Sequence, residues 1–140
     1  MCFKKRFYNE SILKKNYTKI WENNKEILSK GGHGDPFLMS PENDTRMGLS
    51  LLIRIKGEVL SQISDYIQEL KSIEPTLYYY PPKDFHITVL DIQRGEPNRT
   101  IPSNVNDYIF CIQKCVEAIS PFTINFNGTT ASDNCVLVCG

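Results

Sequence analysis

The chain has 140 residues, 41% hydrophobic and 23% charged, and its 16 basic and 16 acidic residues cancel. This length is typical of a single domain, and the composition excludes a disordered or low-complexity protein. The balanced charge argues against binding duplex nucleic acid mainly through its phosphates, which requires a basic excess. No apolar run approaches the roughly 18 residues of a membrane span, and no apolar segment follows the basic start, so we expect a cytoplasmic protein without membrane contact.

Five cysteines are present, and two pairs of them are spaced four residues apart: Cys111 with Cys115, and Cys135 with Cys139. Neither pair has the Cys-x-x-Cys spacing of a zinc site, and no histidine lies near them in sequence, so we expect neither a metal nor another cofactor. Small buried hydrophobes in a reducing compartment are the favoured interpretation of these residues and of Cys2. A disulfide or a redox role is the alternative.

The first third of the chain predicts a helix followed by an ordered loop. Apolar residues recur at helical spacing over residues 10–29, with Lys, Glu and Asn between them. Gly31 and Gly32 then end the helix, and residues 31–47 concentrate Gly, Pro, Asp and Asn. We take residues 1–47 as an extension of a main domain that spans residues 48–140.

Strands and helices alternate along the predicted main domain. β-Branched and aromatic runs predict strands, and apolar residues every three or four positions predict helices that end before Pro75 and at Pro121. The predicted strands are 48–55, 77–80, 85–92, 122–126 and 135–139, the helices 58–73 and 103–119, and the turns 95–98 and 127–134. The expected fold is α/β of the α+β kind, with helices packed on a mixed, mainly antiparallel sheet.

The last predicted strand is apolar throughout, and the chain ends directly after it at Gly140. Soluble proteins usually cover such an edge, because its unpaired backbone groups can pair with another chain. We therefore expect this strand edge to support a homodimer.

The residues with the clearest chemical promise are His86 and Thr88, in the run Asp-Phe-His-Ile-Thr-Val-Leu. Alternate residues of a strand share a face, so the imidazole and the hydroxyl point the same way. A histidine can move protons near neutral pH, and a threonine can donate a hydrogen bond to a phosphate oxygen. The alternative is a solvated histidine beside a threonine of good strand propensity.

Two nearby residues are candidate substrate contacts. Tyr80 closes a run of three tyrosines whose rings could stack on a nucleobase, although packing in a core explains them as well. Lys83 could hold a phosphate, although a lysine at the start of a strand is more often simply solvated.

The segments GLSLLIRIKG, Tyr-Tyr-Tyr-Pro, DFHITVLDI and PFTINFNGTTASDNCVLVCG, which lie between Gly48 and Gly140, resemble the two-histidine (2H) phosphoesterase superfamily. Within it, they are most similar to the LigT-like group of 2′-5′ RNA ligases and cyclic phosphodiesterases. The resemblance implies a LigT-like fold with two lobes, each carrying a His-x-Thr/Ser motif. It also implies that one histidine is a general base and the other a general acid on a phosphodiester, without a metal. His86 and Thr88 match the first motif.

Nothing in the chain matches the second motif. The other histidine, His33, lies in the predicted loop, and the residue two positions later is Asp35. We therefore expect the N-terminal part of a longer family protein, with an incomplete second lobe and weak or no turnover. The resemblance implies an RNA or nucleotide phosphodiesterase-like protein that binds a nucleotide or an RNA-end phosphate. The alternative is a non-catalytic nucleotide-binding or protein-interaction module that docks through the helix at 10–29 and the last strand.

Overall fold

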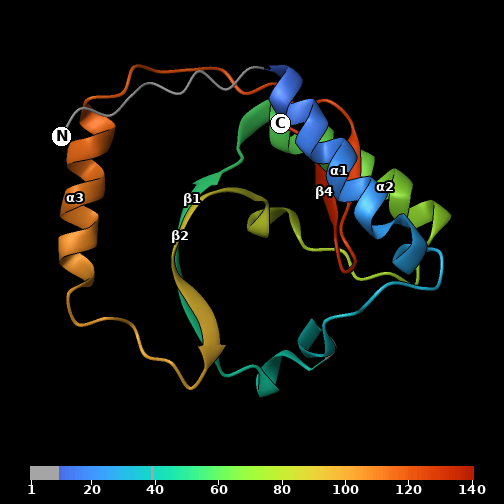
Figure 1. The fold of residues 1–140 in the computed structure, drawn as a ribbon, viewed down its shortest axis with the longest axis horizontal. Coiled ribbons are helices and arrows are strands. Elements are labelled where there is room, and N and C mark those ends of the chain that lie inside the picture. The colour runs from blue at the N-terminus through green and yellow to red at the C-terminus, as the bar shows by residue number, and fades with distance from the viewer. Residues whose placement is uncertain (1–9, 39) are drawn as a thin grey trace. The chain divides into compact units, whose positions relative to one another are not determined.

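A computed structural model describes residues 10–38 and 40–140, and Cys2 lies outside them. Over these ranges the chain is α+β: three α-helices and two two-stranded antiparallel sheets (Figure 1). No helix in the described residues is both long enough and apolar enough to cross a membrane. The coarse fold class predicted from the sequence is confirmed.

The described residues form two compact units. The first holds the described residues up to Pro36 together with Ile119–Gly140, and the second is Phe37–Ala118. The domain boundary expected between residues 47 and 48 lies inside the second unit, within its first strand (residues 46–54), and stays a prediction.

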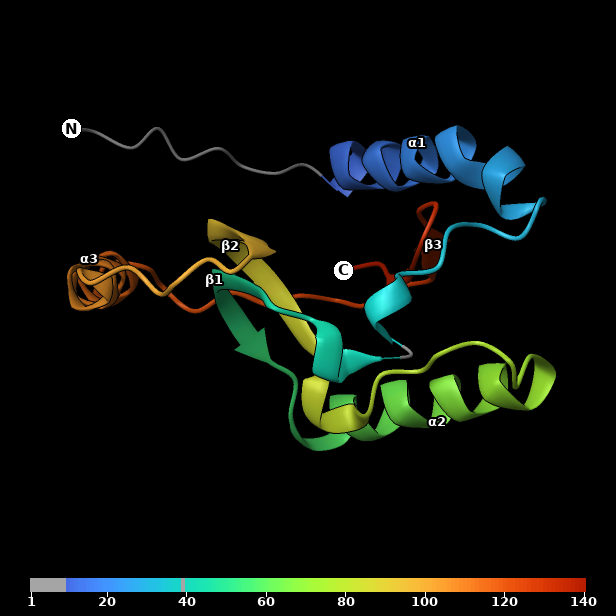
Figure 2. The same ribbon diagram turned by 90° about the horizontal axis from the view of Figure 1, so that it is seen from below.

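In the first unit, helix α1 (Glu10–Leu28) lies on strand β3 (Thr129–Ala131), which pairs antiparallel with β4 (Val136–Val138) (Figure 2). The buried side chains of the described chain gather here: Thr130, Ala131 and Cys139. This small hairpin and the helix on it therefore contain the core of the unit.

Tyr17 of α1 fastens the helix to the hairpin. Its hydroxyl donates to the Gly140 carbonyl at 2.9 Å and accepts from the Gly140 amide at 3.2 Å. The Thr130 hydroxyl donates to the Tyr17 carbonyl at 3.1 Å. These bonds satisfy polar groups that would otherwise be costly to bury.

Helix α1 ends as its glycines predict. Gly31 and Gly32 adopt φ of 106° and 67°, values that side chains with a Cβ rarely take. The Gly32 amide then donates to the Ile27 carbonyl and the Gly31 amide to the Leu28 carbonyl, both at 3.0 Å. These bonds satisfy carbonyls that have no partner inside the helix.

The second unit contains β1 (Arg46–Arg54), α2 (Gly57–Ile73), β2 (His86–Pro97) and α3 (Val105–Glu117). Strands β1 and β2 form one antiparallel pair, and neither α2 nor α3 has a buried residue. The helices expected at 58–73 and 103–119 are confirmed as helices. Their apolar stripes nevertheless stay largely solvent-accessible, as at Val116, which is 56% exposed.

The β1–β2 ladder is interrupted three times by register shifts. At Gly48 the two backbones approach closely: a Cβ there would lie 2.9 Å from the Gly95 amide nitrogen and 3.0 Å from the Gln93 carbonyl oxygen. Glycine is required at this position, because any side chain would push the strands apart.

Several predicted strand limits were wrong. Residues 77–80 and 122–126 form no strand. Strand β2 extends to Pro97, inside the turn expected at 95–98, and β3 lies inside the turn expected at 127–134. Within residues 122–126, exposed and half-buried residues alternate over 123–126 but Phe122 is 70% exposed, and the segment has no ladder partner in the described chain. Alternating hydrophobicity alone therefore does not make a strand, because a strand also needs a neighbour to pair with.

The cysteine prediction holds at one described position. Cys139 is buried, at 8% exposure, and burial raises the pKa of its thiol. Cys111, Cys115 and Cys135 are exposed, so the interpretation as buried hydrophobes was wrong for them. Two of these three lie on α3, whose apolar stripe is itself uncovered by the described residues.

Candidate functional site

His86 and Thr88 lie on one face of β2, as the strand pattern predicted. The register places Arg54 of β1 directly opposite His86, and Leu52 opposite Thr88. Directly opposite residues of an antiparallel pair share a face, so Arg54, His86 and Thr88 form one polar group on that face. All three are exposed and accessible to a ligand from solvent.

The His86 ring is held by a short hydrogen bond. Its Nδ1 lies 2.6 Å from the backbone carbonyl oxygen of Asp84. A carbonyl can only accept, so Nδ1 carries the hydrogen and donates it. In the neutral ring, Nε2 then holds the lone pair, the form that a general base requires.

The Asp84 carbonyl is positioned by a short 3-10 turn, η3 (Pro82–Asp84). The Asp84 amide donates to the Pro81 carbonyl at 2.9 Å, and the Phe85 amide donates to the Pro82 carbonyl at 3.2 Å. The two prolines limit φ along this turn, so its geometry is built in before β2 begins. The prolines that follow residues 77–80 thereby position the carbonyl that holds the His86 ring.

Arg54 is a residue that the sequence analysis missed. Its Nη1 donates to the backbone carbonyl of Lys83 at 3.1 Å, which fastens the end of β1 to η3. The signal was present in the sequence as a basic residue near the end of a predicted strand. That residue could be connected with His86 only through the strand register, which places Arg54 opposite His86.

The two expected substrate contacts lie close to this face along the chain. Lys83 is the middle residue of η3 and is exposed, while Tyr80 lies two residues before that turn. The Tyr80 ring meets Tyr78 edge to face, with centroids 5.0 Å apart. Tyr80 is 53% exposed and Tyr78 48%, so packing in a core does not account for these rings.

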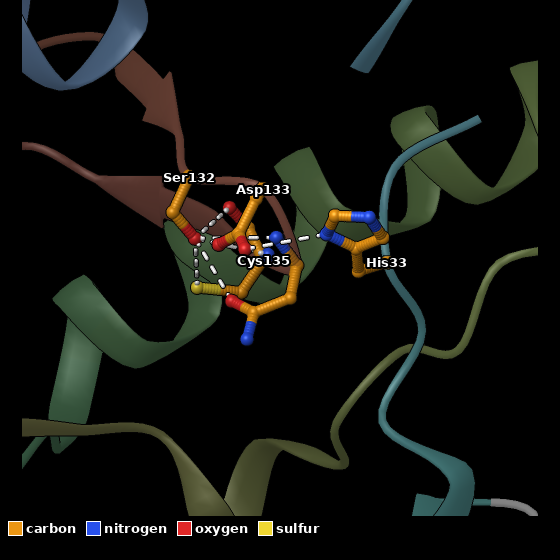
Figure 3. Close-up of polar contacts among 5 residues, drawn as sticks. His33, Ser132, Asp133 and Cys135 are labelled. Carbon is orange, nitrogen blue, oxygen red and sulfur yellow. Dashed lines mark hydrogen bonds and ion pairs between the residues drawn. The ribbon is translucent and has the colours of Figure 1, made fainter. Parts of the chain in front are cut away.

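His33 lies in the other unit, in a separate group of polar residues (Figure 3). Its backbone amide donates to the Asp133 carbonyl at 2.7 Å, and its Nδ1 lies 3.5 Å from a carboxylate oxygen of the same residue. Both side chains are substantially exposed. His33 also lines an open hollow of about 240 Å³ with Glu26, Ile27, Lys30 and Gly32.

The residues around Asp133 make the bonds of a hairpin turn between β3 and β4. The Ser132 hydroxyl accepts from the Cys135 amide at 3.2 Å and donates to the Asn134 side chain at 2.9 Å (Figure 3). Its oxygen also lies 3.2 Å from the Cys135 sulfur. These local bonds are typical of a serine that stabilises a turn, so this group has a structural role.

Comparisons with models of protein families, with curated proteins and with solved structures found no match for this chain. The resemblance to two-histidine phosphoesterases therefore stays a prediction drawn from the residues. What bears on function is the geometry around His86.

Proposed function

We propose that the face of β2 that carries His86 and Thr88 binds the phosphate of a nucleotide or an RNA end. The chain would then be an RNA or nucleotide phosphodiesterase-like protein of the LigT-like group, acting in the cytoplasm without a metal. The observation that supports this most strongly is the bond from His86 Nδ1 to the Asp84 carbonyl, because it leaves Nε2 as the basic nitrogen.

The proposed chemistry is attack of water on a 2′,3′-cyclic phosphate. As the new oxygen–phosphorus bond forms, Nε2 of His86 accepts the proton that water loses, and one bridging oxygen–phosphorus bond breaks. The Thr88 hydroxyl donates to a non-bridging oxygen, where negative charge develops.

The leaving oxygen also needs a proton. The sequence holds no second His-x-Thr/Ser motif to donate it, so solvent supplies this proton in the proposed reaction. A general acid typically contributes about 10²–10⁴-fold to a rate, so we expect slow turnover from this chain.

A LigT-like fold with an incomplete second lobe is part of the same proposal. The segments GLSLLIRIKG and DFHITVLDI, which carry the resemblance, fall mainly on β1 and β2. Their antiparallel pairing on either side of α2 in the chain supports the proposal.

The test is hydrolysis of 2′,3′-cyclic nucleotides in the presence of EDTA by the unchanged chain, His86→Ala and His33→Ala. We expect slow hydrolysis that falls at least about 100-fold in His86→Ala and is unchanged in His33→Ala. Robust hydrolysis that survives His86→Ala would show that another group does the chemistry.

If hydrolysis is undetectable, binding decides the question. Titration of the labelled chain with 2′,3′-cyclic AMP should shift the ring resonances of His86 and leave those of His33 in place. An unperturbed His86 ring at millimolar ligand would contradict the proposal and favour the non-catalytic interaction module.

A further inference from the structure

The His86 face contains one cation whose chemistry the proposed function does not yet use. A phosphodiester carries a negative charge, whereas a neutral imidazole and a hydroxyl carry none. Arg54, at the end of β1 and opposite His86, is the arginine that the register places on this face. Because a guanidinium presents parallel N–H groups that match two phosphate oxygens, arginine suits this task better than lysine.

We propose that Arg54 is the anion-binding residue of this face and donates to the non-bridging oxygens of the bound phosphate. This inference rests on the proposed function for its ligand. Arg54 is thereby a binding residue distinct from the base, His86, and from the hydroxyl donor, Thr88.

The contact with Lys83 prepares Arg54 for this role. One N–H group of the guanidinium is used by the Lys83 carbonyl, at 3.1 Å, and a guanidinium has five such groups. A side chain that one hydrogen bond already holds in place loses less conformational freedom when a ligand binds.

The same contact couples Arg54 to His86. Arg54 bonds the carbonyl of Lys83, and His86 bonds the carbonyl of the next residue, Asp84. Two consecutive carbonyls of η3 therefore hold the side chains of Arg54 and His86. Their spacing is set by the turn rather than by two independent loops.

The experiment titrates the full chain and its variants with two probes, 2′,3′-cyclic AMP and inorganic phosphate, and follows the side-chain resonances of Arg54 and His86. Arg54→Gln removes the charge, and Arg54→Lys keeps the charge without the paired donors. Arg94→Gln is the matched control, because Arg94 is an exposed arginine eight positions beyond His86 on β2. Amide spectra report whether each variant retains the β1–β2 pairing.

We expect the affinity for 2′,3′-cyclic AMP to fall about tenfold in Arg54→Gln, less in Arg54→Lys, and not at all in Arg94→Gln. Added salt should weaken binding to the unchanged chain more than binding to Arg54→Gln, since salt screens the exposed charge. Should Arg54→Gln fail to keep the strand pairing, Arg54→Lys and the salt dependence carry the test.

The remaining outcomes separate the two proposals. Equal affinity of Arg54→Gln and the unchanged chain, with His86 still perturbed, would overturn the role of Arg54 and leave the proposed function standing. Suppose that inorganic phosphate shifts the resonances only when Arg54 is present, and that 2′,3′-cyclic AMP does not shift the His86 ring. This result would support the anion site and contradict the proposed function. No response to either probe would overturn both.

Discussion

At the scale of single residues, Thr88 offers the cleanest separation of binding from strand structure. Thr88→Val removes the hydroxyl and keeps the branched shape that suits β2, while Thr88→Ser keeps the hydroxyl. Because a hydrogen bond to a charged group contributes about 1.5–3 kcal/mol, we expect the Kd for 2′,3′-cyclic AMP to rise about tenfold or more in the valine variant and to change little in the serine variant.

Calorimetry or the same titration measures these constants. Equal affinities of the valine and serine variants would show that the Thr88 hydroxyl does not contact the ligand.

A second residue-scale prediction concerns the ion pair at the start of β1, between Asp44 and Arg46. The Asp44 carboxylate accepts from the Arg46 backbone amide at 3.0 Å, from Nε at 2.8 Å and from Nη2 at 2.7 Å. The Arg46 guanidinium also lies 4.4 Å from the centre of the Phe37 ring. The side-chain and backbone hydrogen bonds from Arg46 lower the pKa of Asp44.

We predict that Arg46→Gln raises the pKa of Asp44 toward its ordinary value, as followed by carbon NMR of the carboxyl group. A carboxyl whose pKa is lower in the folded chain stabilises that chain above the unfolded-state pKa. This stabilisation is lost as the pH falls through the folded-state pKa. An Asp44 titration that is the same in both proteins would show that the pair does not persist in solution.

At the scale of elements, the β1–β2 pair depends on the close approach at Gly48. We predict that Gly48→Ala lowers the local stability of the strand pair by about 1–3 kcal/mol, because the added methyl group meets backbone atoms that cannot move aside. Gly95→Ala is the matched control, since a Cβ there meets only the Arg46 side chain at 4.0 Å.

Amide hydrogen exchange at Leu51 and Leu90, which face each other across the pair, measures this effect directly. Exchange should accelerate strongly in Gly48→Ala and little in Gly95→Ala. Similar rates in both variants would show that the bulged ladder widens at no cost.

At the scale of the whole molecule, self-association through β4 stays a prediction. The strand pairs with β3 along one edge, and its Val136 side chain is 58% exposed. We expect the sedimentation coefficient to rise with concentration and this rise to disappear in Val136→Lys, because a charge at a sheet edge disfavours pairing.

Ile73→Lys is the control, because it places the same charge on α2 at a side chain that is 79% exposed. A monomer at all concentrations, with the amides of Val136 and Val138 protected from exchange, would contradict self-association.

The helices were predictable from the sequence because their determinants are local. The apolar period and the two glycines predicted α1 almost to its last residue, and the same reasoning found α2 and α3. Strand limits depend on partners distant in sequence, so 122–126 was predicted as a strand and Thr129–Ala131 as part of a turn.

The candidate site also divides into a part with local determinants and a part that depends on tertiary contacts. His86 and Thr88 were predictable because strand alternation by itself puts them on one face. The sequence could not show that Nδ1 of His86 bonds the Asp84 carbonyl, since this depends on how the prolines turn the chain.

By itself, then, the sequence determined the α+β class, the helices and the shared face of His86 and Thr88, all of which arise from periodicities of a few residues. Tertiary structure alone decided that Arg54 lies opposite His86 and that His33 lies in a different unit. The physical reason is that register and long-range contacts depend on which backbones approach each other. Such approaches are set by features like the missing Cβ at Gly48, whose consequence appears only when its neighbour across the ladder is present.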